Sequence, residues 1–394
     1  MSPLLVPADL DDADRAAIDE AGRTGEIDDI HGALLRFPDG SRCTPLSAAD
    51  AGEFPPRMRY TRLDENANGN ENHFQGAERL GRYLLISGGD WREPAAHLFV
   101  VRMGSQPERG PWKSNAGAGV GPQSEDMVVG TIVVDAGLWH AGGMDTLGPV
   151  LAVPVEYPAV GGLQRFVQRL RGVNLPDLGS TDRSRVTFYH MADPERPKRL
   201  PCAIERSGRK ATAVAIARLP NLHYLVAVLS APAKDRVRLD FYLSDTAHLG
   251  DIAAPAGEPP CPGFARPPAV WLGATRDFPH YQALDFVRQA DDTLFLVGLH
   301  NTSDKAPFRK GDDEIGLWKV EFEASTDEPP PIDSPLPPPR LTFIARKSLD
   351  GGDACNMDAG AGLYIEDGGV FVYGVAHWRT PGGTISMAQF APPE

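Results

Sequence analysis

A pattern of short strands recurs five times along the chain, and this repeat constrains the fold more than any other feature of the sequence. Each copy has a first strand rich in small residues, a tight turn, and a strongly apolar second strand. In four of the five copies, a leucine stands seven residues after the start of the copy. The starts lie 67 to 76 residues apart, at His73, His140, Thr212, His280 and Asn356.

Two more strands complete each copy. A third strand follows each second strand, and a fourth precedes the next copy, but the fifth copy has no fourth strand before Glu394. The segment RMRYTRLDE at 57–65 has the pattern of this fourth strand, and we expect it to complete the fifth copy. Sheets closed into a ring in this way leave no exposed edge between the first copy and the last.

The chain is therefore predicted to be all-β and to resemble the five-bladed β-propellers, with an N-terminal strand closing the last blade and short helical insertions. The resemblance covers roughly residues 57–392 and concerns the fold alone, because no motif of a particular family is matched. Residues 57–394 would form the propeller, and residues 1–56 a helical or irregular extension packed on it. A β-sandwich with insertions is the alternative, but it does not account for five matched strand sets with one displaced strand.

Helical periodicity is confined to two segments. Residues 8–36 are expected to hold one or two short acidic helices. Residues 162–173 place four apolar side chains on one face and three arginines largely on the other. This second helix is either a cover packed on blade 2 or a lid whose arginines attract an anionic substrate.

Composition excludes several classes of partner. Lys and Arg number 39 against 53 Asp and Glu, and the net charge of −14 argues against nucleic-acid binding. No apolar stretch is long enough to span a membrane.

The first twenty residues lack the pattern of a secretory signal and the four cysteines are scattered, which predicts a cytoplasmic protein with reduced thiols. The Gly-rich segment 110–122 lacks the form of a phosphate-binding loop, so no nucleotide cofactor is expected. The oligomeric state is left open.

Candidate functional residues follow from the repeat. In a propeller the first strand of each blade lines the central channel, so first-strand starts and second-strand ends share one face. Histidine accounts for only 10 of 394 residues, yet three of the five starts are His73, His140 and His280. These imidazoles are predicted to hold a divalent metal (Zn, Fe, Cu or Ca) or to act without metal as acid–base groups. Asp358 and Glu156 are predicted to complete the catalytic set. Substrate binding is predicted for residues near the same channel mouth: Gln75, Gln282, Asn356, Trp91, Tyr157, His300, His377 and Trp378.

This set of residues favours an enzyme that acts on a small organic molecule by hydrolysis, elimination or cyclisation, with or without a divalent metal. Three other interpretations stay open. The histidines could instead cap strand ends structurally, or the propeller could bind a ligand or carbohydrate without catalysis. A pair of carboxylates could also hydrolyse glycosides. Five-bladed propellers include glycosidase families, which this chain resembles only in blade count.

Overall fold

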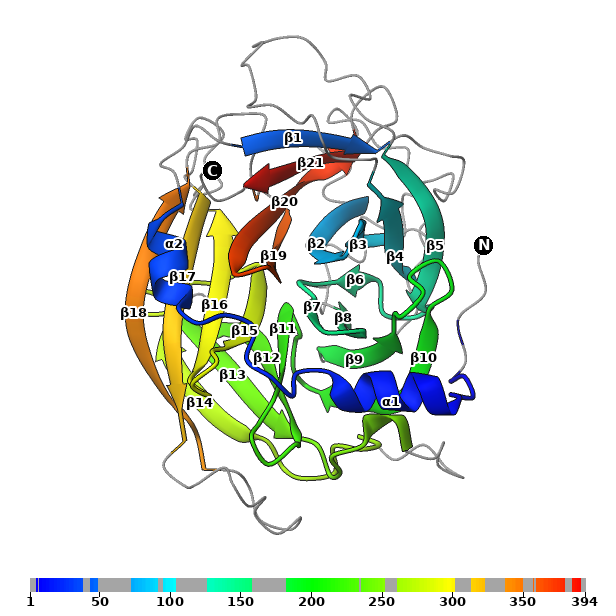
Figure 1. Ribbon diagram of the computed structural model, residues 1–394, viewed down its shortest axis with the longest axis horizontal. Coiled ribbons are helices and arrows are strands. Elements are labelled where there is room, and N and C mark those ends of the chain that lie inside the picture. Colours follow the sequence, from blue (N-terminus) through cyan, green and yellow to red (C-terminus); the bar gives the residue numbers. More distant parts are fainter. Residues whose placement is uncertain are drawn as a thin grey trace, which may run out of the picture.

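The chain folds into a five-bladed β-propeller in which five antiparallel sheets form a ring (Figure 1). The computed structural model describes residues 5, 7–37, 43–48, 72–90, 95–103, 126–157, 182–233, 235–251, 261–301, 313–322, 337–349, 357, 359–379 and 385–390. Within these ranges the side chains of residues 43–48, 72, 73, 90, 232, 233, 376–379, 385 and 386 are not described. The ring of five antiparallel sheets confirms the predicted fold class, an all-β five-bladed propeller.

Each blade is a sheet of consecutive strands, with its first strand nearest the ring axis. Blade 1 contains β2 (Asn72–Leu80), β3 (Tyr83–Asp90), β4 (Ala95–Arg102) and β5 (Met127–Asp135). Blade 2 has a first strand split into β6 (His140–Ala141) and β7 (Asp145–Leu147), followed by β8 (Val150–Tyr157), β9 (Arg183–His190) and β10 (Lys198–Ser207). Blade 3 contains β11 (Ala213–Arg218), β12 (Tyr224–Ala233), β13 (Arg236–Leu243) and β14 (Ala269–Ala274).

The last two blades complete the ring. Blade 4 contains β15 (Ala283–Arg288), β16 (Leu294–Asn301), β17 (Asp313–Glu321) and β18 (Arg340–Leu349). Blade 5 contains β19 (Gly360–Glu366), β20 (Gly369–Arg379), β21 (Ile385–Phe390) and, as its outermost strand, β1 (Cys43–Ala48). We call the side of the ring where the first strands begin the start face, and the opposite side the helix face.

The N-terminal strand that closes the ring is β1, and its position differs from the prediction. It pairs antiparallel with β21, from Cys43 opposite Phe390 to Ala48 opposite Ile385. The segment 57–65, which we expected in this place, lies outside the described residues. The short sequence CTPLSA has a weak strand pattern because it contains Pro45, which has no N–H to donate. An outermost strand pairs on one side only, so it accommodates a proline that an inner strand would not.

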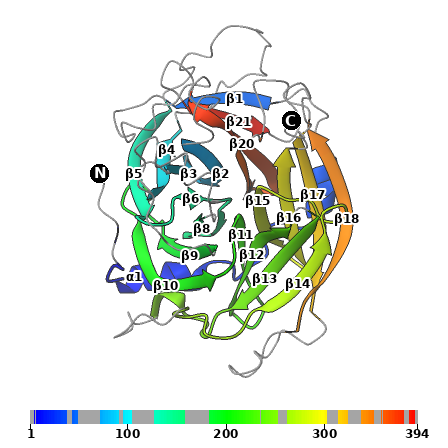
Figure 2. The ribbon, with the colours of Figure 1, turned by 180° about the vertical axis from the view of Figure 1, so that it is seen from behind.

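Both helices expected within residues 8–36 are present. Helix α1 (Asp12–Glu20) begins with a capping box in which Asp11 and Asp14 bond each other's backbone N–H. Helix α2 (Ile30–Leu35) is capped by Asp29, and the single turn η2 (Leu249–Asp251) lies beside α1. Seen from behind, both helices lie on the far side of the sheets (Figure 2). The helix expected at 162–173 lies outside the described residues.

Apolar side chains fill the junctions between neighbouring blades. The described residues form five buried clusters, one at each junction, including the junction of blades 5 and 1. At that junction Phe74 and Ile86 of blade 1 join Tyr373 and Met387 of blade 5. Helix α1 adds Ile18 to the cluster of blades 2 and 3, and α2 adds Ile30 to that of blades 4 and 5. The ring is thus closed by packing as well as by β1.

The first strands meet at the axis so closely that small residues are required there. The backbone N–H of Gly143 donates to the Thr212 carbonyl, and its carbonyl accepts from Val214, both at 3.0 Å. A Cβ atom on Gly143 would lie 2.1 Å from the carbonyl oxygen of Gln282 in blade 4. This contact explains why the first strands are rich in small residues. Among the described residues, no helix is long and apolar enough to cross a membrane.

Candidate functional site

On the start face, the structure brings together two of the residues predicted to be catalytic. His140 in β6 lies directly opposite Glu156 in β8. The His140 Nδ1 is 3.2 Å from Oε1 of Glu156, and the side chains are 19% and 3% exposed, respectively. The second carboxylate oxygen of Glu156 accepts a hydrogen bond of 2.8 Å from the backbone N–H of Ala211. The carboxylate is therefore fixed on both oxygens.

The environment of Glu156 keeps it ionised. Burial acts to raise its pKa, but the hydrogen bond and charge of His140, together with Lys210 and the Ala211 N–H, outweigh burial and lower the pKa below its usual value. An ionised carboxylate next to Nδ1 selects the imidazole tautomer that carries its proton on Nδ1. In this tautomer the lone pair is on Nε2, the atom through which an imidazole accepts a proton or binds a metal.

A second histidine–carboxylate pair lies on blade 4. His300, predicted to bind substrate, has its Nε2 3.2 Å from Oε2 of Glu314. The ring of Tyr281 stands edge-on to His300, with 5.2 Å between ring centroids. Burial lowers the pKa of His300, and repulsion from Arg346 and His280 adds to this effect. His280 itself is exposed, and it lies close enough to His300 to contribute to lowering the pKa of His300.

Other predicted site residues lie in different environments. Gln75 and Gln282 are half-buried where the first strands contact one another, beside Gly360 and Gly143, respectively. Tyr157, which was predicted to bind substrate near the channel mouth, is completely buried. The remaining predicted positions are outside the described residues, either wholly (Trp91, Asn356, Asp358) or in their side chains (His73, His377, Trp378).

The set of three metal-binding histidines stays a prediction, because the side chain of His73 is not described. Among the described residues, one group of three side chains has metal-ligand spacing, and it contains neither His140 nor His280. This group consists of Glu78 in β2, Asp145 in β7 and Asp285 in β15. One carboxylate oxygen from each lies within 4.8 Å of the other two, and all three residues are buried.

The sequence analysis missed these three carboxylates, although the repeat contained the signal for them. Each stands five residues after a first-strand start that is a histidine. Equivalent positions on first strands converge at the axis, so acidic residues in the same register on three blades must meet. Burial is the main cause that raises the pKa of each carboxyl, and repulsion between the acids adds to it for Glu78 and Asp145.

A cavity of about 270 Å³ opens beside two of these carboxylates, Asp145 and Asp285, near the helix face. Its walls include Asp145, Asp285, Arg79 and Tyr364, together with Glu26 from the segment between α1 and α2. Arg79 lies over the Tyr364 ring, 4.3 Å from its centroid, and its guanidinium is 3.3 Å from Glu366. Arg79 is thus already paired with a carboxylate outside the group of three.

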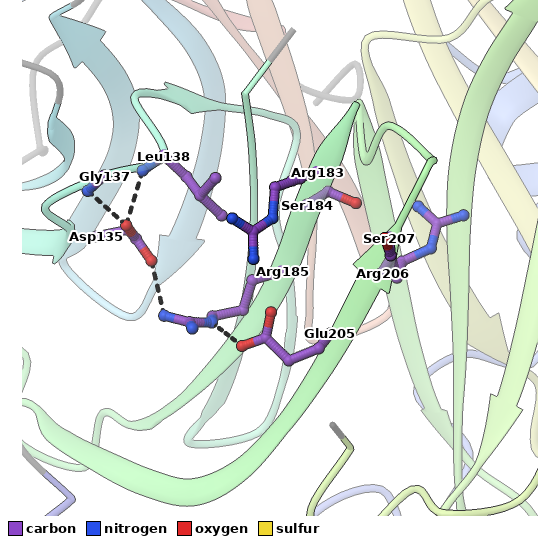
Figure 3. Close-up of a pocket in the computed structure, with 9 residues that line it drawn as sticks. All are labelled: Asp135, Gly137, Leu138, Arg183, Ser184, Arg185, Glu205, Arg206 and Ser207. Carbon is purple, nitrogen blue, oxygen red and sulfur yellow. Dashed lines mark hydrogen bonds and ion pairs between the residues drawn. The ribbon is translucent and has the colours of Figure 1, made fainter. Parts of the chain in front are cut away.

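A second hollow of about 300 Å³ lies at the outer part of blade 2 (Figure 3). Arg185 crosses it, donating to Asp135 at 2.8 Å and to Glu205. Asp135 also accepts backbone hydrogen bonds from Gly137 and Leu138, as Figure 3 shows. The charged side chains of this hollow largely satisfy one another, which is typical of a structural network.

Comparison with models of known protein families gave no match, and no curated protein matched the sequence. Among solved structures, a crystal structure of the polysaccharide lyase Uly1 aligns over 91% of this chain and 98% of its own, with 9% identity and a TM-score of 0.31. A likeness this distant carries no information about function. The assignment of the fold rests on the five sheets and their closure.

Proposed function

We propose that the protein is an enzyme that acts on a small organic molecule at the start face, with His140 as the group that moves a proton. The observation that supports this proposal is the contact between His140 Nδ1 and the buried carboxylate of Glu156. Glu156 acts as a positioning residue because its carboxylate beside Nδ1 holds the imidazole in one tautomer and one orientation. The His140 side chain is 19% exposed, which leaves part of the imidazole at the surface of the start face.

The chemistry this arrangement supports is general acid–base catalysis. As a base, His140 would take a proton through Nε2 from water or from a carbon next to an electron-withdrawing group, leading to hydrolysis or elimination. As an acid, the imidazolium would then return that proton to the leaving group. A divalent metal bound by Nε2, with His73 and His280 as further ligands, would use the same hydrogen bond from Nδ1 to Glu156.

A panel of chromogenic substrates tests the proposal. Hydrolysis of p-nitrophenyl esters and glycosides is followed by p-nitrophenolate release, and elimination from uronates by absorbance of the new double bond. We expect His140→Gln to reduce the activity found by at least about 100-fold, which is the usual contribution of a general acid or base. His31→Gln on helix α2 serves as the control and should behave as the wild type.

The Glu156→Gln variant separates positioning from a merely structural role. The substituted side chain would keep the shape of glutamate but lose its charge, so we expect a smaller loss of kcat and a changed pH profile. The far-UV circular dichroism of both variants should match that of the wild type. Activity that survives His140→Gln would contradict the proposal and favour the carboxylate-based glycoside hydrolase, and binding without turnover would favour the non-catalytic alternative.

A further inference from the structure

Three carboxylates from three different blades meet at the ring axis without a basic partner that would explain their burial. Glu78 is 0% exposed, Asp285 2% and Asp145 3%. Among the described residues, the groups that shift the pKa values of these carboxyls are other acids and backbone N–H groups, with no lysine or arginine among them. Burying several ionised carboxylates is costly unless a proton or a cation compensates their charge.

The backbone already orients two of the three carboxylates. Oδ2 of Asp145 accepts from the N–H of Ile216 at 2.7 Å and from that of Phe286 at 3.2 Å. Oδ1 of Asp285 accepts from the N–H of Leu363 at 3.3 Å. These hydrogen bonds come from blades 3, 4 and 5, so the carboxylates are held rigidly relative to the whole ring.

The oxygens that remain point to a ligand. Within the described part of the chain, neither carboxylate oxygen of Glu78 has a hydrogen-bond donor beside it, and Oδ2 of Asp285 has none either. Glu78 is held against blade 5, where a Cβ atom on Gly362 would lie 2.5 Å from its Oε1. Glu78 and Asp285 can bond each other directly only if they share a proton, which is the alternative to a cation. Buried polar atoms normally have a hydrogen-bond partner. The two oxygens of Glu78 that lack a donor therefore indicate a ligand independently of the closeness of the three carboxylates.

We infer that Glu78, Asp145 and Asp285 form a site for one divalent cation with oxygen ligands, of the kind that Ca²⁺ prefers. Oxygens within 4.8 Å of one another can all contact an ion at the distances of about 2.3–2.6 Å usual for Ca²⁺. The adjoining cavity of about 270 Å³ has room for the water molecules that would complete the coordination. The ligand set is all oxygen, which distinguishes this site from the three-histidine site predicted from the sequence.

Such a cation would stabilise the ring. It would connect the first strands of blades 1, 2 and 4 at the axis and compensate the charge of the three buried acids. Binding to the folded state alone raises the stability of that state by mass action. The site is separate from the His140–Glu156 pair, so its test does not depend on the proposed enzymatic function.

Calorimetric titration of the full-length protein tests the inference. Protein prepared without a histidine tag is stripped with EDTA and titrated separately with Ca²⁺, Mg²⁺ and Mn²⁺, and the bound metal is counted by mass spectrometry. We expect one ion per chain, a higher melting temperature with the ion, and affinity weakened more than about tenfold in Glu78→Gln and Asp285→Asn. Glu205→Gln, a change of the same type at the outer edge of blade 2, and His140→Gln should bind as the wild type does.

Two results would overturn the inference. One is the absence of binding of all three ions to the wild type, in particular if Glu78→Gln is more stable than the wild type without metal, since the cluster would then hold a shared proton. The other is unchanged binding in both Glu78→Gln and Asp285→Asn, which would place the ion elsewhere. If one variant fails to fold, the other variant and the metal content of the wild type still decide the question.

Discussion

Buried ionisable side chains in this ring differ in whether they have an oppositely charged or hydrogen-bonding partner. Asp240 in β13 contacts Arg206 and Arg238, and both members of the Arg206–Asp240 pair are completely buried. His97 in β4 is buried, its Nδ1 has no hydrogen-bond partner among the described residues, and its ring stacks on Phe99 with 5.9 Å between centroids. Paired charges of the first kind fix the geometry of two blades. An unpaired imidazole of the second kind makes stability depend on pH.

His97 should destabilise the protein in mild acid. Burial lowers its pKa from the ordinary 6.5 to about 4 in the folded state. The unfolded chain therefore takes up the proton first as pH falls, and stability declines between pH 6.5 and about 4. Each pH unit within this window costs about 1.4 kcal/mol, or about 2 kcal/mol by pH 5.

Urea unfolding at pH 7 and pH 5 measures this effect. We expect His97→Leu to lose about 2 kcal/mol less stability than the wild type between the two pH values. Phe99→Leu, a change at the neighbouring ring without a titrating group, should show the wild-type dependence. Equal losses in the wild type and His97→Leu would show that His97 does not control this part of the acid response.

At the scale of elements, a buried cation adds to the apolar contacts that attach the N-terminal helix α1 to the propeller. Arg218 at the end of β11 is 1% exposed. Its guanidinium donates to the carbonyls of Asp19 and Ala21 at the end of α1, and to those of Leu222 and Ala247. A positive charge at the carboxyl end of a helix is also favoured by the helix dipole. Arg218 thus holds α1 to blade 3.

Replacing Arg218 with methionine should release α1 selectively. The substitution keeps an apolar stem of similar length but leaves several buried carbonyls unpaired, so we expect a loss of about 3 kcal/mol in the free energy of unfolding. Hydrogen–deuterium exchange should become faster in residues 12–20 while the blade strands keep their protection. Unchanged protection of α1 would contradict this role for Arg218.

For the whole molecule, the number, order and approximate limits of the blades could be predicted from the sequence. Each blade contains the same tight turn followed by an apolar second strand, and this pattern is visible in the sequence alone. The fourth strand of blade 1, for example, is expected just before the start of the second copy at His140, and β5 ends there at Asp135. An N-terminal closing strand was predicted, but at the wrong residues. Pro45 weakens the strand pattern of β1, and β1 pairs with β21, which is more than 300 residues away in the sequence.

The candidate site was less predictable than the fold. Histidine is rare in this chain, so His140 stood out, and the turn between β7 and β8 brings it opposite Glu156. Glu78, Asp145 and Asp285 were missed because acidic residues are common here, and only the alignment of first strands reveals that these three share one register. In a propeller, the neighbours of a side chain near the axis come from other blades. The sequence of a single strand therefore does not reveal them.

The closure of the ring by β1 is the premise on which the positions of His140, Glu156 and the axial carboxylates all depend. It can be tested by cross-linking in a Cys43→Ser background, with Ser47→Cys on β1 and Ser386→Cys on β21, which are register partners. Paired residues on antiparallel strands lie about 4.5–5.5 Å apart, within reach of a disulfide. The control pair, Thr44→Cys with Ser386→Cys, is offset by three residues, or about 10 Å, beyond that reach.

We predict that oxidation links the two cysteines introduced at the register partners in the folded protein, detected as a joined peptide by mass spectrometry, and that the link raises the melting temperature. The offset pair should stay reduced under the same conditions. A folded protein that links the offset pair, or neither pair, would contradict closure by β1 and with it the common axis on which the proposed sites depend.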